Sequence, residues 1–127
     1  MRQCRNFLQD TAGASAAEFA LVFPVLAILL IGTLHLCIMV YANSTLQFAV
    51  DDAARCESVK TTICPDAGST QTHAATTFGF ANLTPNFVAS NLPCGYQVVG
   101  TATYALNAVV TTISVPLSAT SCFPVQN

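Results

Sequence analysis

The chain has 127 residues, of which 53% are hydrophobic and only 8% carry a formal charge, against about 25% in average soluble domains. Four basic and six acidic side chains give a net charge of −2, which is too little positive charge to bind nucleic acid through a basic surface. High hydrophobicity with low charge also excludes an intrinsically disordered chain, and the length predicts one small domain.

The first predicted element is a single membrane-spanning helix over residues 19–41. No charged residue lies between Glu18 and Asp51, and the apolar stretch lacks the polar face of a soluble helix. As a helix it is about 34 Å long, enough to cross a hydrocarbon core of about 30 Å. Arg2 and Arg5 precede it, so the positive-inside tendency predicts a cytoplasmic N-terminus and an outer C-terminal part.

The carboxylate of Glu18 lies at the edge of this span. Such a group costs free energy if it enters hydrocarbon, and it is stabilised by the N-terminal end of a helix dipole. A free α-ammonium group from a neighbouring subunit would stabilise it further in a layer of low dielectric constant. That pairing requires a new N-terminus near Glu18, and therefore a cut just upstream.

Two sequence motifs accompany the span. The first, GASAAEFALVFP at residues 13–24, follows a short basic leader and runs into the span. The second, DDAAR at residues 51–55, lies beyond it. Over residues 11–56 this pattern resembles the TadE-like pseudopilins, which are minor pilin-like proteins of the bacterial tight-adherence (Flp, type IVc) pilus system.

The resemblance implies that a prepilin peptidase cuts between Gly13 and Ala14. Glu18 and Phe19 then become the fifth and sixth residues of the mature chain, where they serve assembly. The implied partners are the membrane, the peptidase, other pilin-like subunits and the inner-membrane assembly platform. The implied function is pilus assembly in adhesion and biofilm formation, with the C-terminal domain in the periplasm or built into a surface pilus.

Helical periodicity continues beyond the span, which predicts one helix over about residues 14–59. Its outer part has an apolar face and a polar face; the apolar face holds Leu46, Ala49, Val50, Ala53 and Ala54, and the polar face holds Ser44, Gln47, Asp51 and Arg55. Asp51 and Arg55 are four residues apart and can pair. The apolar face needs a cover, so we expect an α+β fold in which a small antiparallel sheet packs on the helix, as the pilin resemblance also implies.

The remaining elements are short. Residues 65–72 read as a loop, residues 73–82 as a short helix, and residues 84–95 as a loop with at most a short strand. Residues 95–106 and 108–117 are rich in β-branched and aromatic residues and predict a hairpin. A strand starting at Val98 is expected to break at Gly100, and residues 118–127 form a tail.

Four of the six cysteines lie on the predicted outer side, where disulfides persist. We favour Cys56–Cys64, which closes a short loop at the end of the helix, and Cys94–Cys122, which joins the first and last parts of the sheet region. Four cysteines allow two other pairings, namely Cys56–Cys94 with Cys64–Cys122 and Cys56–Cys122 with Cys64–Cys94. The spacings do not resemble those of zinc ligands, so no metal is expected.

No catalytic motif or phosphate-binding loop occurs, so we expect neither an enzyme nor a cofactor. The expected organisation is a cytoplasmic leader at 1–13, a long helix at 14–60 and an outer disulfide-bonded domain at 61–127. That domain contains no Asp, Glu, Lys or Arg from residue 67 onward. Two alternatives remain: an uncut single-pass anchor that carries a binding domain, and a secreted domain released by signal peptidase after Ser44.

Overall fold

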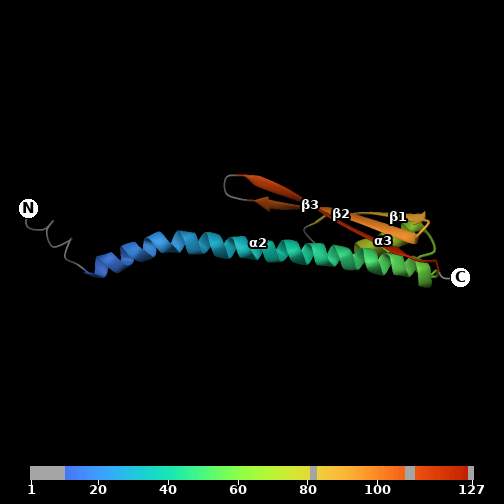
Figure 1. Ribbon diagram of the computed structural model, residues 1–127, viewed down its shortest axis with the longest axis horizontal. Coiled ribbons are helices and arrows are strands. Elements are labelled where there is room, and N and C mark those ends of the chain that lie inside the picture. Colours follow the sequence, from blue (N-terminus) through green and yellow to red (C-terminus); the bar gives the residue numbers. More distant parts are fainter. Residues whose placement is uncertain (1–10, 81–82, 108–110, 126–127) are drawn as a thin grey trace, which may run out of the picture. The chain divides into compact units, whose positions relative to one another are not determined.

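The computed structural model describes residues 11–80, 83–107 and 111–125. In these described residues, two helices and three strands follow one another in the order α2, α3, β1, β2, β3 (Figure 1). A long helix followed by a three-stranded antiparallel sheet confirms the predicted α+β fold. The chain divides into two compact units, and the boundary falls inside α2 between Cys37 and Ile38. We call them the N-terminal unit and the C-terminal unit.

Helix α2 runs from Thr11 to Val59 without interruption and includes Pro24. It ends where the periodicity predicts, and it contains a stretch long and apolar enough to cross a membrane. None of that stretch is buried within the protein; Leu21 and Ile28, for example, are 77% and 73% exposed. Such an apolar surface is unfavourable in water, which agrees with membrane anchoring.

In the C-terminal unit, one face of α2 forms the base of the core. All five residues of the predicted apolar face are fully buried: Leu46, Ala49, Val50, Ala53 and Ala54. The predicted polar residues are exposed, so the assignment of the two faces is confirmed. The expected Asp51–Arg55 ion pair is not among the ion pairs of the described residues; Asp51 Oδ1 instead accepts a hydrogen bond from Gln47 Nε2 at 3.2 Å.

The sheet has the order β1-β2-β3, and both strand pairs are antiparallel. Strand β1 covers Asn86–Leu92, β2 covers Gly95–Asn107 and β3 covers Thr112–Phe123. The hairpin prediction is confirmed, but β3 continues through much of the predicted tail. The 84–95 segment contains a full strand because its backbone pairs with β2 over seven positions.

The expected break at Gly100 is wrong, because β2 passes through this residue without interruption. A Cβ atom at position 100 would lie 2.8 Å from Phe87 Cε1 and 2.8 Å from Val50 Cγ1. Glycine is therefore needed here for the close approach of the sheet to α2.

The loop expected over residues 65–72 is also wrong, because α3 spans Ala67–Phe78. Asp66 caps its N-terminus: Ser69 N–H donates to Asp66 Oδ1 at 2.7 Å, and Asp66 N–H donates to Ser69 Oγ at 3.2 Å. This reciprocal capping box offsets the weak helix propensity of the threonines and Gly68. The helix ends at Phe78, where Gly79 with a φ of 54° forms its C-terminal cap. It is therefore shorter at this end than predicted. The predicted end at residue 82 lies outside the described residues.

Two disulfides join parts of the C-terminal unit. Cys56 bonds to Cys64 across a separation of 8 residues, and Cys94 bonds to Cys122 across 28. These are the pairs that the sequence analysis favours over the two alternatives. The first ties the last turn of α2 to the segment before α3, and the second ties the β1–β2 turn to the end of β3.

Candidate functional site

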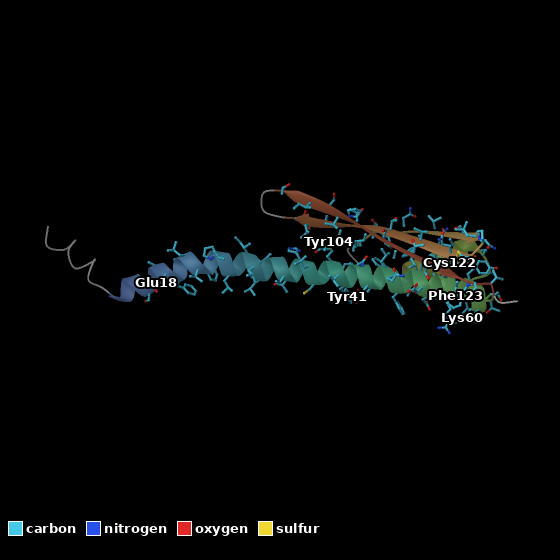
Figure 2. The ribbon with its side chains drawn as sticks, in the orientation of Figure 1. Glu18, Tyr41, Lys60, Tyr104, Cys122 and Phe123 are labelled. Atoms are coloured by element: carbon cyan, nitrogen blue, oxygen red, sulfur yellow. A yellow bond between two sulfur atoms is a disulfide. The ribbon has the colours of Figure 1, made fainter. Side chains whose placement is uncertain are left out.

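The residues expected to serve processing and assembly lie near the start of α2. Gly13, Glu18 and Phe19 are all exposed in the N-terminal unit, and Figure 2 shows Glu18 near the beginning of the helix. The Phe19 side chain is 66% exposed, and its ring centroid lies 5.6 Å from that of Phe23. Two aromatic rings therefore extend the apolar surface directly from Glu18 into the predicted span.

The peptide bond between Gly13 and Ala14 belongs to the first turn of α2. A Cβ atom on Gly13 would meet nothing within 4 Å, so no other described part of the chain covers this position.

Positions 14 and 18 are one helical turn apart, so they share one face of α2. A charged α-amino group at position 14 would lie near the Glu18 carboxylate of the same chain. Both groups would lie at the edge of an apolar layer, where water screens charges weakly.

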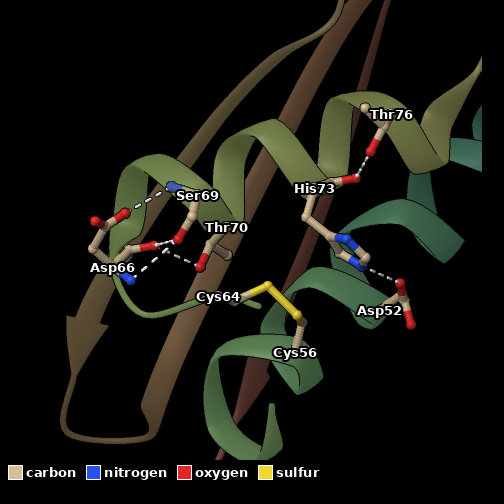
Figure 3. Close-up of a disulfide and its surroundings, with 8 residues drawn as sticks. All are labelled: Asp52, Cys56, Cys64, Asp66, Ser69, Thr70, His73 and Thr76. Carbon is tan, nitrogen blue, oxygen red and sulfur yellow. Dashed lines mark hydrogen bonds and ion pairs between the residues drawn. A yellow bond between two sulfur atoms is a disulfide. The ribbon is translucent and has the colours of Figure 1, made fainter. Parts of the chain in front are cut away.

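A polar cluster that the sequence analysis did not predict joins the two helices of the C-terminal unit. His73 Nε2 of α3 lies 2.7 Å from Asp52 Oδ2 of α2 (Figure 3). The sequence analysis places residue 73 at the start of a short helix and does not pair it with Asp52. Together with the neighbouring Cys56–Cys64 disulfide, this contact holds α3 against the last turns of α2.

This cluster also contains the atoms closest to a metal-binding arrangement. The sulfur atoms of Cys56 and Cys64 and a ring nitrogen of His73 lie within 4.8 Å of one another. Both sulfurs are engaged in a disulfide, and zinc binds thiolates rather than disulfide sulfur. The arrangement therefore joins α2 to α3 by a hydrogen bond and to the segment before α3 by a disulfide.

Asp66 has a perturbed acidity. The backbone N–H of Ser69 donates to this carboxylate and lowers the pKa of Asp66 below its ordinary value, with smaller contributions from the Ser69 hydroxyl and the backbone N–H of Gly68. These bonds favour the ionised form. The shift is explained by capping of α3, so Asp66 has a structural role.

A surface hollow of about 460 Å³ lies between α2 and the end of β3. Its lining combines the ring of Phe48, which is 63% exposed, with charged groups of α2 and with Ser121, Cys122 and Phe123 of β3. The charged groups are Asp51, Asp52 and Arg55. From residue 67 onward the sequence contains no formally charged side chain, so the formal charges of this unit lie on α2 and on the segment between α2 and α3.

Comparison with known proteins gives one match. Residues 13–55 match the family described as TadE-like protein, which confirms the resemblance over about a third of the chain. No curated protein and no solved structure matches the chain. The match begins at Gly13, covers the apolar stretch of α2 and ends at Arg55, and it indicates involvement in the tight-adherence pilus system.

Proposed function

We propose that this chain is a non-enzymatic, minor pilin-like subunit of a tight-adherence pilus, cut by a prepilin peptidase between Gly13 and Ala14. The observation that carries the proposal is the match to TadE-like proteins, because it covers Gly13, Glu18 and the whole predicted span. The match then covers the sequence that the cut would place at the mature N-terminus. In this account the leader, residues 1–13, is removed.

The anchor of the mature chain is the apolar stretch of α2 over residues 19–41. None of its most apolar part is buried within the protein. This supports a bilayer as its surroundings, because exposing apolar surface to lipid costs less free energy than exposing it to water. The basic residues Arg2 and Arg5 favour a cytoplasmic start. The C-terminal unit then lies in the periplasm, where its two disulfides are stable.

Glu18 is proposed to guide assembly. After the cut, the mature chain carries an α-ammonium group one turn before this carboxylate, at the edge of the membrane. A neighbouring subunit shifted along the fibre axis presents the same ammonium group to the same carboxylate. Pairing of these charges in a layer of low dielectric constant selects one axial offset between subunits, while the exposed Phe19 contributes apolar contact.

The alternative of release after Ser44 fits the packing less well. Ala42 is fully buried, and Met39 packs against the same core. A cut after Ser44 would remove both side chains from the C-terminal unit and would interrupt the hydrogen-bond ladder of α2. The uncut anchor keeps these contacts, so it differs from the proposal only in retaining the leader.

The N-terminal residue of the chain purified from bacterial membranes distinguishes the three accounts. The proposal predicts Ala14, an uncut anchor predicts Met1 and a released domain predicts Thr45. The measurement is made in cells with and without an active prepilin peptidase. Recovery of Ala14 only when the peptidase is active supports the proposal, and recovery of Met1 or Thr45 in the presence of the peptidase contradicts it.

A further inference from the structure

The free end of the β2–β3 hairpin carries apolar side chains. Beyond Thr101, the last position at which β1 pairs with β2, β2 and β3 continue as a two-stranded ribbon. Tyr104 pairs with Val115 and Leu106 pairs with Ile113, so these four side chains share one face of the ribbon. We call them the ribbon face. Ile113 is 52% exposed, which leaves its apolar surface without full cover from this chain.

The ribbon lies alongside the part of α2 that belongs to the same unit. Near one end, Val115 and Leu117 line a hollow together with Met39 and Val40. Just beyond the other end of β3, the Pro124 carbonyl accepts a hydrogen bond from Ser58 Oγ of α2 at 2.8 Å. Strand β3 therefore runs in the same direction as α2. Its first residues lie nearest residues 38–40, where α2 enters the C-terminal unit.

The depth of the ribbon face follows from this alignment. A second hollow, of about 530 Å³, brings Ile38 together with Tyr104, Ala105 and Asn107. Ile38 lies within the predicted span, about 5 Å before its outer end at Tyr41 at 1.5 Å per residue. Figure 2 shows Tyr104 above the same stretch of α2 as Tyr41. The ribbon face is therefore level with the boundary between hydrocarbon and headgroups.

The chemistry of the ribbon suits this position. Neither the ribbon nor the lining of the 530 Å³ hollow contains a formally charged residue, so no charge has to lose its hydration on contact with lipid. Tyrosine is enriched where a bilayer meets water, and both Tyr41 and Tyr104 occur at this level. The ring centroid of Tyr41 lies 6.0 Å from that of Phe80, which adds an aromatic group from the lining of the same hollow.

We propose that the ribbon face and the hollow beside Ile38 form a lipid-contacting surface that rests in the outer interface of the bilayer. The inference rests on the membrane anchoring included in the proposed function. A continuous apolar surface then runs from the span to the ribbon, so the C-terminal unit is held against the membrane at a second point. This contact limits rotation of the unit before the subunit leaves the bilayer for a fibre.

The absence of tryptophan from the chain provides a direct test, because one introduced tryptophan is a unique fluorescent probe. Three single variants of the full chain are placed in phosphatidylcholine nanodiscs whose lipids are unbrominated, brominated near the headgroup end of the acyl chains, or brominated near their methyl end. Ile113→Trp probes the ribbon face and is measured with the headgroup-end bromines. Ile28→Trp probes the middle of the span and is measured with the methyl-end bromines. Thr120→Trp is the matched control on the same strand, about 23 Å further from the span at 3.3 Å per residue.

The proposal predicts loss of fluorescence on bromination for Ile113→Trp and for Ile28→Trp, with little loss for Thr120→Trp. Quenching at position 28 with no more quenching at 113 than at 120 overturns the ribbon contact and leaves the anchor intact. An unquenched probe at position 28 overturns the anchor and the ribbon contact together. Brominated lipids therefore separate the failure of this inference from the failure of the proposed function.

Two further measurements complete the test. If Ile113→Trp fails to form its native disulfides, Leu106→Trp reports from the paired position with the same expected quenching. Each measurement is repeated at a higher lipid-to-protein ratio. Quenching that persists on dilution supports contact with lipid. A probe at position 113 that stays unquenched at both lipid-to-protein ratios, while the probe at position 28 is quenched, overturns the proposal.

Discussion

Val50 of α2 lies directly against Gly100 of β2, with so little space that a Cβ atom on Gly100 would come within 2.8 Å of Val50 Cγ1. Both residues are near the centre of the C-terminal unit, and Val50 is fully buried. The contact sets how closely the sheet approaches the helix. The sheet can therefore pack on α2 at this distance only because residue 100 has no side chain.

The first prediction concerns this contact. Gly100→Ala should lower the free energy of unfolding of the C-terminal unit by about 1–3 kcal/mol, because overpacking forces neighbouring side chains to shift. Urea unfolding of the full chain in detergent measures the loss. Gly68→Ala is the control, because a Cβ there meets only ordinary contact, 3.4 Å from Asp66 Oδ1, and alanine favours the helix.

A combined variant tests the cause of that loss. Val50→Ala removes Val50 Cγ1, one of the three atoms that a Cβ at position 100 would approach most closely. In the Val50→Ala background, Gly100→Ala should therefore cost less than it does alone, which is a non-additive result. An equal loss of free energy of unfolding in both backgrounds would show that Val50 is not the reason why position 100 requires glycine.

The second prediction concerns processing. Gly13→Lys should block the cut, because the peptidase must accommodate a long charged side chain where the chain has none. Intact mass of the membrane-bound chain should then retain residues 1–13. Gly32→Ala is the control, since its added Cβ also meets nothing within 4 Å, and it should be cut normally. A Gly13→Lys chain that begins at Ala14 would contradict the assigned cleavage site.

The third prediction concerns the disulfides. In the chain-entropy description, a disulfide that closes a loop of 28 residues stabilises the folded state by about 3.6 kcal/mol, and one that closes a loop of 8 residues by about 2.5 kcal/mol. Removal of Cys94–Cys122 by paired serine substitutions should therefore lower the free energy of unfolding more than removal of Cys56–Cys64. Urea unfolding under non-reducing conditions gives the comparison. Equal losses for the two paired variants would contradict this description of the disulfides.

Thiol counting on the denatured, unreduced wild-type chain is the control for that comparison. A processed chain should expose one reactive thiol, that of Cys37, and an uncut chain should expose Cys4 as well. Four additional alkylatable thiols would show that the disulfides do not form in cells.

The fourth prediction is a pH dependence that arises from the cap of α3. The pKa of Asp66 is lowered in the folded chain, so its contribution to stability is present above the ordinary carboxyl pKa. That contribution is lost as the pH falls through the lower pKa of the folded state. Asp66→Asn keeps an N-cap acceptor without a titrating group, and should therefore be less sensitive to acid in urea unfolding. Asp51→Asn, at an exposed site on α2, controls for loss of one carboxylate. Identical acid dependence in wild type and Asp66→Asn would be inconsistent with the cap.

Sequence periodicity was sufficient to predict the long helix, because Leu46, Val50 and Ala53 recur at helical spacing and all are buried. The β2–β3 hairpin was also predictable from its β-branched residues. The start of α3 was missed because threonines and Gly68 have weak helix propensity, while the capping box of Asp66 and Ser69 outweighs them. Its signal, Asp followed by Ser three residues later, is present in the sequence.

Contacts between distant segments could not be predicted in the same way. Gly100 resembles a strand breaker until the sheet is placed against Val50, since only tertiary packing demands a residue without a side chain. The contact between His73 and Asp52 depends on how α3 folds back on α2. The ribbon beside Ile38 likewise depends on the register of β2 and β3.

The fifth prediction concerns Glu18, whose pairing with a mature α-amino group is the centre of the account. Glu18→Ala should still be cut after Gly13, because the scissile bond is unchanged, but its subunit should fail to support pili. Glu18→Gln keeps the size of the side chain without its charge and should fail equally. Asp10→Ala, a carboxylate lost with the leader, is the control and should behave as wild type.

The most direct measurement is a count of surface pili by electron microscopy in cells whose only copy of this protein is the Glu18→Ala variant, with its mature N-terminus verified as Ala14. The account predicts few or no pili in these cells and normal numbers in the Asp10→Ala control. Normal pilus numbers with a correctly cut Glu18→Ala chain would contradict it.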